Sequence, residues 1–385
     1  MAQKTLWTNA SVYTAAGFIP NGRMLVSGDG RIEAIGGAEV EDAEAVRRDA
    51  GGALLLPGLI DVHNHGAAGA HTNDARAESL ETISRYHAAH GTTAFLPTTN
   101  TDEADRIEAA LKLAAREMER DFGGADIVGI HLEGPFLSEA KRGAQRKEHL
   151  ALPTLELRQR FYEASEGNIR LVTIAPEIEH GMEAVEWFAE LGVTVSIGHS
   201  NAAYEEAMEA VKRGARHTTH HFNGMSALHH RRPGVAGAGL TCDELTIEII
   251  ADGHHVHPAV IRAAFALKTP NRVCLITDSV NFAGLPDGEY DGVLVKDGVI
   301  TLSGTDTLAG SSLTAWRGLC NTVQFTGLPL ETILPSFTAV PARQAGISHR
   351  KGTLDPGMDA DFLLVSPQME LLATYVRGRK VYEAR

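Results

Sequence analysis

Residues 54–66 read Leu-Leu-Leu-Pro-Gly-Leu-Ile-Asp-Val-His-Asn-His-Gly, and this stretch decides the fold. Its apolar run is typical of a buried strand, and the run stops at His63 and His65. Side chains two positions apart on a strand point to the same side. We therefore expect both imidazoles to project from one strand end, in a geometry suited to gripping a metal ion. If a barrel surrounds this strand, the pair lies at the active face of the barrel.

Further apolar runs follow this one, and each ends in polar residues. Together the runs cover residues 54–65, 93–99, 127–133, 171–176, 194–199, 217–223, 245–255 and 273–278. Helical patterns lie between several of them, as at residues 77–90 and 201–213. This alternation predicts an α/β fold with a parallel sheet, and its length fits a (β/α)8 barrel of the TIM type. The alternative is an open, doubly wound sheet, but the polar residues at successive strand ends favour the barrel.

Both ends of the chain carry short strand patterns. Residues 5–14, 23–27, 31–35, 362–365, 374–376 and 380–382 are strand-like. Neither end is large enough to form a good core alone, so we predict one small discontinuous β-sandwich domain from residues 1–56 plus 346–385. Residues 57–345 then form the catalytic barrel. A hairpin pattern around Lys296-Asp297-Gly298 either joins the β-domain or decorates a loop.

The composition argues against several classes of protein. The 385 residues carry a net charge of −14, whereas sequence-independent binding to nucleic acid needs a basic face. Cys242, Cys274 and Cys320 have no paired spacing, so no disulfide framework is expected. No apolar stretch has the length of a membrane span or the position of a secretory signal. We expect a cytoplasmic protein with neither a nucleic-acid nor a membrane partner.

Side chains that bind metals recur at the predicted strand ends. Besides His63 and His65 these are Glu133, His199, His220, His255 and Asp278. Imidazole and carboxylate are ligands for zinc, iron and manganese alike. We expect Glu133, His199 and His220 to hold one ion. His63, His65 and Asp278 are expected to hold a second. Each residue alone has an ordinary explanation, such as surface polarity, a helix cap or wall packing, but their joint recurrence favours a metal site.

The same strand ends predict a hydrolytic reaction. A divalent ion lowers the pKa of a water ligand toward about 7, and Asp278 is placed to act as general base and then as general acid. The run His229-His-Arg-Arg232 is basic in an acidic chain. It is either a solvated loop or, together with His255, part of a binding site for phosphate or carboxylate. No Walker, dinucleotide or Gly-x-Ser-x-Gly motif is present in the sequence.

Nearly the whole chain resembles the amidohydrolase superfamily, and within it the N-acetylglucosamine-6-phosphate deacetylases. The motifs that carry the resemblance are Pro57-Gly-Leu-Ile-Asp-Val-His-Asn-His-Gly66, Gly91-Thr-Thr-Ala-Phe-Leu-Pro-Thr98, His131-Leu-Glu-Gly-Pro-Phe136, Gly198-His-Ser-Asn201, His220-His-Phe-Asn-Gly-Met225, Arg232-Pro-Gly-Val-Ala-Gly237, Ala251-Asp-Gly-His-His-Val256, Thr277-Asp278, Leu308-Ala-Gly-Ser-Ser-Leu313 and Gly352-Thr-Leu-Asp-Pro-Gly-Met-Asp-Ala-Asp361. The first and last motifs are common to many amidohydrolases, whereas the middle ones are more specific to the deacetylases.

The resemblance implies a metal-dependent barrel with a small β-sandwich. The implied activity is hydrolysis of the acetamide of N-acetyl-D-glucosamine 6-phosphate, in amino-sugar catabolism or recycling. Glu133, His199 and His220 would hold the main metal ion, and Asp278 would activate the water and then protonate the leaving amine. His63 and His65 vary within the family, which implies one or two ions per subunit, zinc first and iron or manganese as alternatives.

The resemblance also implies where the substrate binds. Asn223, the backbone at Gly224 and His255 would contact the phosphate. Arg231 would reach the phosphate of a second subunit, which implies a homodimer. Leu308 would lie in the loop that borders the acetyl group.

One position departs from the family pattern. Many members carry a histidine in a Lys-x-Gly-x-His context where this chain has Lys141-Arg-Gly-Ala-Gln145. The Gln145 amide donates hydrogen bonds but cannot become cationic, so we expect it to bind substrate without a charge. The alternatives for function are a deacetylase of the galactosamine epimer, another amidohydrolase such as a cyclic-amide hydrolase, or a non-catalytic sugar-phosphate-binding protein.

Overall fold

The computed structural model describes residues 3–384, and parallel strands form its centre. A three-stranded sheet contains β6 (Leu59–Asn64), β9 (Thr92–Pro97) and β10 (Asp126–Ile127). A six-stranded sheet runs in chain order through β11 (Ile130–Glu133), β12 (Ile169–Ile174), β13 (Thr194–Ile197), β14 (Ala215–Thr218), β15 (Thr246–Ile250) and β16 (Val273–Ile276). Isolated parallel bridges, Thr98 with His131 and Asn64 with Ser279, connect the two sheets on both sides.

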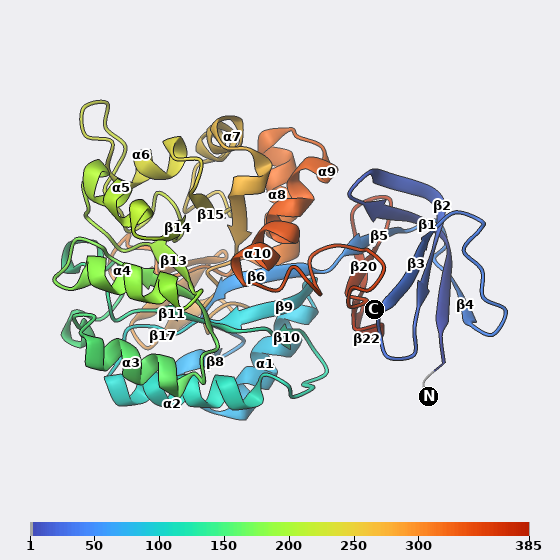
Figure 1. Cartoon of the computed structure of the whole chain (residues 1–385), viewed down its shortest axis with the longest axis horizontal. Coiled ribbons are helices and arrows are strands. Elements are labelled where there is room, and N and C mark those ends of the chain that lie inside the picture. The colour runs from blue at the N-terminus through green and yellow to red at the C-terminus, as the bar shows by residue number, and fades with distance from the viewer. Residues whose placement is uncertain (1–2, 385) are drawn as a thin grey trace.

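Helices alternate with these strands along the chain and lie around them (Figure 1). They are α1 (Ala77–Ala88), α2 (Ala104–Glu117), α3 (Leu155–Ala164), α4 (Gly181–Glu190), α5 (Tyr204–Lys212), α6 (Gly234–Thr241), α7 (Pro258–Leu267), α8 (Ala315–Thr326), α9 (Leu330–Ile333) and α10 (Ala339–Gln344). In α2, the buried residues Ile107, Ala110, Leu111 and Ala114 recur at the spacing of one helix face. Within residues 3–384, no helix combines the length and the apolar character needed to cross a membrane.

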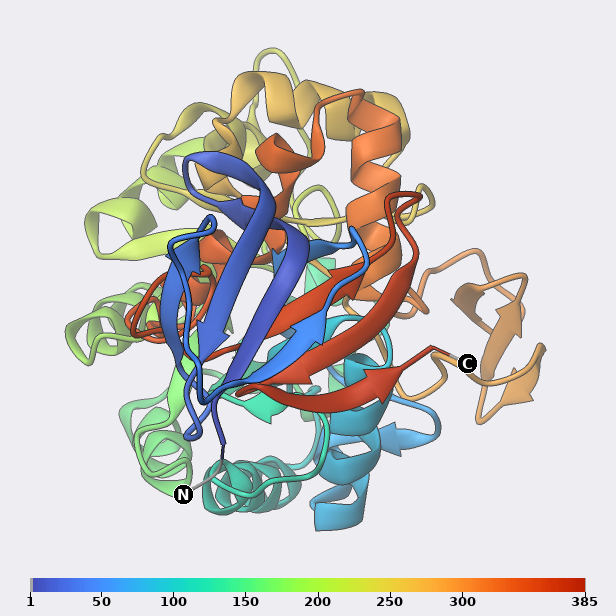
Figure 2. The same ribbon diagram turned by 90° about the vertical axis from the view of Figure 1, so that its right-hand side faces the viewer.

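Strands from both chain ends form one eight-stranded sheet beside this body (Figure 2). Its strands are β1 (Thr5–Thr14), β2 (Gly17–Val26), β3 (Ile32–Gly36), β4 (Val46–Asp49), β5 (Leu54–Pro57), β20 (Phe362–Val365), β21 (Leu371–Val376) and β22 (Arg379–Glu383). β5 pairs with both β1 and β20. The Trp7 ring packs edge-on against Phe362 and Tyr375, with centroids 5.4 and 5.2 Å away. The two ends therefore share one core.

Glycines divide two of the predicted strands. The expectation of one strand over residues 54–65 is wrong, because Gly58 separates β5 in the eight-stranded sheet from β6 in the parallel one. A Cβ at Gly58 would lie 2.1 Å from Thr93 Oγ1, so only glycine fits there. The expected strand over residues 127–133 is likewise split into β10 and β11 by Gly129, whose φ of 153° favours glycine.

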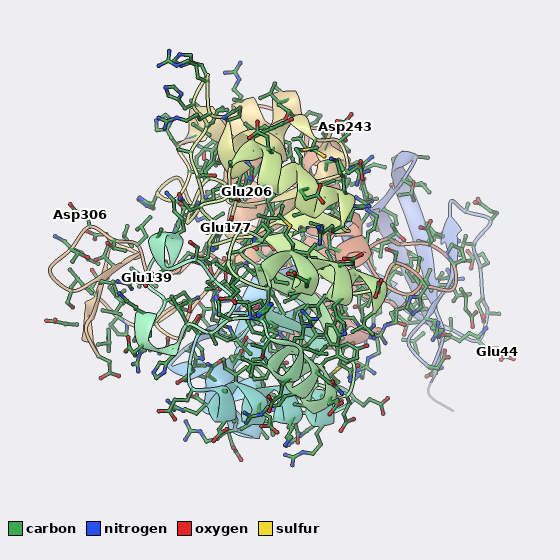
Figure 3. The ribbon with its side chains drawn as sticks, turned by 60° about the vertical axis from the view of Figure 1, so that its left-hand side comes forward. Glu44, Glu139, Glu177, Glu206, Asp243 and Asp306 are labelled. Atoms are coloured by element: carbon green, nitrogen blue, oxygen red, sulfur yellow. The ribbon has the colours of Figure 1, made fainter. Side chains whose placement is uncertain are left out.

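A separate antiparallel sheet follows β16. It contains β17 (Gly288–Tyr290), β18 (Val293–Lys296) and β19 (Val299–Leu302). Asp297 and Gly298 form the turn between the last two strands, with φ of 50° and 79°, as an Asp-Gly hairpin requires. Of the two alternatives left open by the sequence, the hairpin decorates a loop. Figure 3 shows Asp306, on the loop after β19, on the side of the molecule opposite the eight-stranded sheet.

A buried charge cluster joins the end sheet to the parallel sheet. The Lys351 ammonium lies 3.0 Å from Asp126 of β10 and 3.2 Å from Asp359, and it donates a hydrogen bond to Asp361, which precedes β20. Only 1 % of the Lys351 side chain is exposed. Burial alone would lower the pKa of Lys351, but the three carboxylates outweigh it and hold that pKa above its ordinary value.

Candidate metal and substrate site

The ends of parallel strands bring the predicted metal ligands together. His63 lies at the end of β6 with His65 just beyond it, and Glu133 is the last residue of β11. His199, His220 and Asp278 each lie two residues beyond the ends of β13, β14 and β16. Two groups result, in which all ligand atoms lie within 4.8 Å of one another: Glu133 with His199 and His220, and Glu133 with His63 and His65.

In the first group, two imidazole lone pairs face each other. His199 Nδ1 lies 2.8 Å from the carbonyl of Lys141, and His220 Nδ1 lies 3.2 Å from the carbonyl of Asn223. A carbonyl only accepts, so both Nδ1 atoms carry the proton and both Nε2 atoms are bare in the neutral rings. These Nε2 atoms are 3.0 Å apart, and the buried Glu133 Oε1 beside them has no hydrogen-bond partner among the described residues. The arrangement fits a cation between the three side chains.

The second group shares Glu133 with the first. His63 Nε2 and His65 Nε2 are 3.3 Å apart, and they lie 3.5 and 3.1 Å from Glu133 Oε2. Asp278 Oδ1 is 3.3 Å from each of these nitrogens. The three side chains predicted to hold a second ion, His63, His65 and Asp278, thus lie together, and Glu133 Oε2 lies beside them. One oxygen of Glu133 faces each group.

The charges of the site also match a cation. Burial opposes ionisation of Glu133, but the charge of His63 and the close approach of the His199 and His220 imidazoles, 3.4 and 3.3 Å from Glu133 Oε1, outweigh it and hold the pKa of Glu133 well below its usual range. Burial likewise opposes ionisation of Asp278, and the charge of His63 and a hydrogen bond from His65 lower its pKa. The pKa values of both carboxyl groups are lowered by positive charge on neighbouring imidazoles. A divalent ion bound between the same side chains would supply that positive charge in place of the imidazole protons.

Glu248 is a buried site residue that was not predicted from the sequence. From the middle of β15, its carboxylate lies 2.9 Å from His63 Nδ1 and accepts the N–H of His220 at 2.9 Å. It therefore orients His63 with Nε2 toward the metal group and positions the loop that carries His220. The signal was present in the sequence, because a glutamate inside an apolar run needs a buried partner.

The ligand-bearing turns hold unusual backbone conformations. His199, His220 and Asp278 have φ of 45°, 28° and 51°, in the region that non-glycine residues avoid. The expected strand over residues 217–223 is wrong beyond Thr218. The chain turns there and places His220 just beyond the carboxyl end of β14. Such local strain is characteristic of functional sites, where the surrounding fold imposes it.

A cavity of about 630 Å³ opens above these groups. Its lining includes the predicted residues His65, Glu133, Gln145, His199, His220, Asn223, Gly224, His255, Asp278 and Leu308. His63 is fully buried beneath it. Part of the wall was not predicted from the sequence, including Asn100 after β9, Asp291 and Gly292 in the turn between β17 and β18, Val293 of β18 and Leu302 of β19. These residues carry no ligand pattern, and only the fold brings them to the cavity.

The orientation of Gln145 is set by its neighbours. Its Oε1 accepts the N–H of Thr101 at 2.9 Å, which leaves the NH₂ group facing Glu133 Oε2 at 3.3 Å and Asn100 Oδ1 at 3.4 Å. The amide therefore presents donors toward the metal groups without adding a charge there.

Arg231 lies outside the cavity of its own chain. It belongs to the loop between β14 and α6, which extends away from the body (Figure 1). The side chain is exposed and contacts His230, with Arg231 Nη1 2.8 Å from His230 Nε2. The structure thus brings together every predicted substrate contact except this one.

Comparison with known proteins identifies the family. A sequence profile described as the amidohydrolase family matches residues 54–381. The chain belongs to the amidohydrolase family. Within that family it is 38 % identical to the N-acetylglucosamine-6-phosphate deacetylase of Vibrio furnissii, over 86 % of this chain and 83 % of the relative. It is 34 % identical to the N-acetylgalactosamine-6-phosphate deacetylase of Escherichia coli O157:H7, over 95 % and 96 %.

A solved structure supports the same placement. The N-acetyl-D-glucosamine-6-phosphate deacetylase of Mycobacterium smegmatis, studied as an aspartate-to-alanine mutant in complex with N-acetyl-D-glucosamine-6-phosphate, superposes with a TM-score of 0.92. Its sequence is 30 % identical, and the match covers 99 % of this chain and 100 % of that one.

The two ligand groups predict the metal content of this amidohydrolase. Replacing His63 and His65 together with asparagine should remove one metal equivalent and leave the other, because Glu133, His199 and His220 stay intact. Elemental analysis of protein purified without added metal measures this. A matched double variant, His180→Asn with His349→Asn, removes two exposed histidines and should keep the full content. Unchanged stoichiometry in the His63/His65 variant would contradict a two-ion site.

Proposed function

We propose that this amidohydrolase converts N-acetyl-D-glucosamine 6-phosphate and water to D-glucosamine 6-phosphate and acetate. The observation that carries the proposal is one cavity lined by Glu133, His199, His220 and Asp278 and also by Asn223, Gly224 and His255. Ligands for a cation and residues suited to an anion thus share a space of the size of a sugar phosphate. The names of the relatives agree with this substrate class.

In this proposal the chain's own residues divide the work at the acetamide. Asp278 takes a proton from the attacking water and returns it to the nitrogen of the leaving amine. Gln145 directs its NH₂ group toward the reacting carbonyl, and Leu308 borders the acetyl methyl group. A divalent ion held by Glu133, His199 and His220, and a second held with His63, His65 and Asp278, would polarise the carbonyl and acidify the water. We expect zinc, with iron or manganese able to replace it.

The phosphate end of the cavity is proposed to need a second subunit. Asn223, the backbone of Gly224 and His255 would contact the phosphate from one chain. Gly224 has a φ of 57°, and a Cβ there would lie 3.0 Å from His199 Nδ1, so this turn favours glycine. The partner subunit's Arg231 would complete the grip in a homodimer, because the loop that carries it extends away from its own cavity.

The parallel strands are proposed to close into a (β/α)8 barrel over residues 57–345. The bridges of Thr98 with His131 and of Asn64 with Ser279 support closure on both sides. Residues 1–56 plus 346–385 are proposed as a β-sandwich domain, of which residues 1, 2 and 385 lie outside the described part of the chain.

A cytoplasmic location stays a prediction, consistent with the free cysteines Cys242, Cys274 and Cys320.

The experiment that tests the function measures acetate release from four sugars. N-acetylglucosamine 6-phosphate is expected to give the highest kcat/KM, above its galactosamine epimer and far above the two sugars without phosphate. A preference for the epimer would favour the function named for the Escherichia coli relative. Equal turnover of unphosphorylated sugars would contradict the phosphate site, and activity that survives exhaustive chelation would contradict the metal-dependent reaction.

A further inference from the structure

Asp252 accepts three hydrogen bonds in the loop after β15, and two of them come from His255. One carboxylate oxygen accepts the N–H groups of His254 and His255, at 2.8 and 2.9 Å. The other accepts His255 Nδ1–H at 2.6 Å. The side chains are nearly enclosed, with 13 % of Asp252 and 6 % of His255 exposed. The pair is therefore a fixed unit.

The hydrogen bond decides which nitrogen of His255 carries a proton. Burial raises the pKa of Asp252, but the hydrogen bond and charge of His255 outweigh it and lower that pKa, so the carboxylate is ionised. An ionised carboxylate only accepts, so His255 Nδ1 keeps its proton. With that edge of the ring turned to Asp252, Nε2 is the nitrogen left for a ligand in the cavity. In the neutral ring Nε2 is a bare acceptor, which repels phosphate oxygens.

The charges of the other residues that line the cavity make a second proton, on His255 Nε2, important for binding an anion. Among residues 3–384, the cavity lining includes the carboxylates of Glu133, Asp278, Asp291 and Asp306 but only one arginine or lysine, Arg146. Within the described residues, Asp252 is the only carboxylate within 4.0 Å of the His255 ring. Asn321 and Phe325 of α8, which pack against this loop, are uncharged, as are Asn223 and Gly224 across the cavity. Apart from Arg146, a dianion in this cavity would draw its positive charge from His255 or from another subunit.

We infer that Asp252 is a positioning residue that makes His255 bind the substrate phosphate only as an imidazolium. Asp252 keeps one proton of the His255 ring on Nδ1. The ring therefore has an N–H donor at Nε2 only when it carries two protons. This inference rests on the proposed function, because it assigns the phosphate to His255. It predicts that substrate binding weakens as the pH rises and the ring keeps only its Nδ1 proton.

Asp252→Asn separates this role from a purely structural one. The new amide can donate to His255 Nδ1, which lets a neutral ring carry its proton on Nε2. We expect KM for N-acetylglucosamine 6-phosphate to rise about tenfold at pH 6.5, kcat to stay within about twofold, and KM to lose its dependence on pH up to 9. In the unaltered enzyme KM should rise over the same interval. The inhibition constant of inorganic phosphate should follow KM in both proteins.

Two further variants control the experiment. His255→Gln removes the charge, and adding Asp252→Asn to it should cause no further rise in KM, since Asp252 acts through His255. Asp243→Asn, at an exposed position before β15, should leave KM and kcat unchanged. A wild-type pH slope of KM in Asp252→Asn, or an equal effect of Asp252→Asn in the His255→Gln background, would overturn the inference. Turnover of N-acetylglucosamine equal to that of its 6-phosphate would instead overturn the proposed function.

Discussion

Replacing Asp278 with asparagine is expected to lower kcat for acetate release by about 10²- to 10⁴-fold, the usual contribution of a general acid–base group. Asparagine keeps the size of the side chain and an oxygen to face His63 and His65, whose Nε2 atoms lie 3.3 Å from Asp278 Oδ1. It cannot take the proton of the water or return one to the amine. Stopped or coupled assays of acetate release measure the loss directly.

Metal content separates this loss from a damaged site. Asp278→Asn should retain at least the ion held by Glu133, His199 and His220, because these three ligands are unchanged. Asp105→Asn, at a side chain that is 88 % exposed, should retain full activity. Full turnover in Asp278→Asn would remove this residue from the mechanism, and parallel loss of metal and activity would make it a ligand only.

Replacing Lys351 with methionine is expected to destabilise the protein by about 3–5 kcal/mol, the usual effect of removing one partner from a buried ion cluster. The carboxylates of Asp126, Asp359 and Asp361 would then face one another without the ammonium between them. Since the pKa of Lys351 is raised in the folded protein, its stabilising charge is fully present at neutral pH. Thermal and urea unfolding measure the change.

The pH dependence identifies the cause of that loss. Burial already raises the pKa of Asp361, and at pH 5 this carboxylate can take up a proton, so Lys351→Met should be less destabilising there than at pH 8. Lys212→Met, at a side chain that is 76 % exposed, should have little effect at either pH. A loss of the same size at both pH values would point to packing rather than charge. Adding Asp361→Asn to Lys351→Met should recover part of the stability.

The ligand residues could be predicted from the sequence because they follow strand ends. The spacing of His63 and His65 places both rings on one side of β6 whatever the rest of the fold does. The sharing of Glu133 between two groups could not be predicted, because it depends on how the end of β11 is rotated relative to β6 and β13. Glu248 was hidden for a related reason, since its partner His63 lies on a strand that is distant in sequence.

The limits of the strand predictions have local causes. Gly58 ends one strand and begins another because the Thr93 side chain leaves no room for a Cβ, and that contact crosses to a neighbouring strand. The apolar pattern continues through the glycine, so periodicity alone merges β5 and β6 into one run. The turn after Thr218 could not be predicted either. His220 and Phe222 adopt positive φ although neither is glycine, so no typical turn residue marks the position.

The contact between Asn64 and Ser279 has a consequence for biosynthesis. His65 N–H donates to Ser279 O, and Thr277 Oγ1 donates to Asp61 across 216 residues of chain. A ribosome releases the amino-terminal residues long before those near Ser279, so the nascent chain holds its first histidines without the aspartate that completes their group. Pairing over such a sequence distance is slow to form. The complete metal centre therefore assembles late, when the body of the protein has already been synthesised.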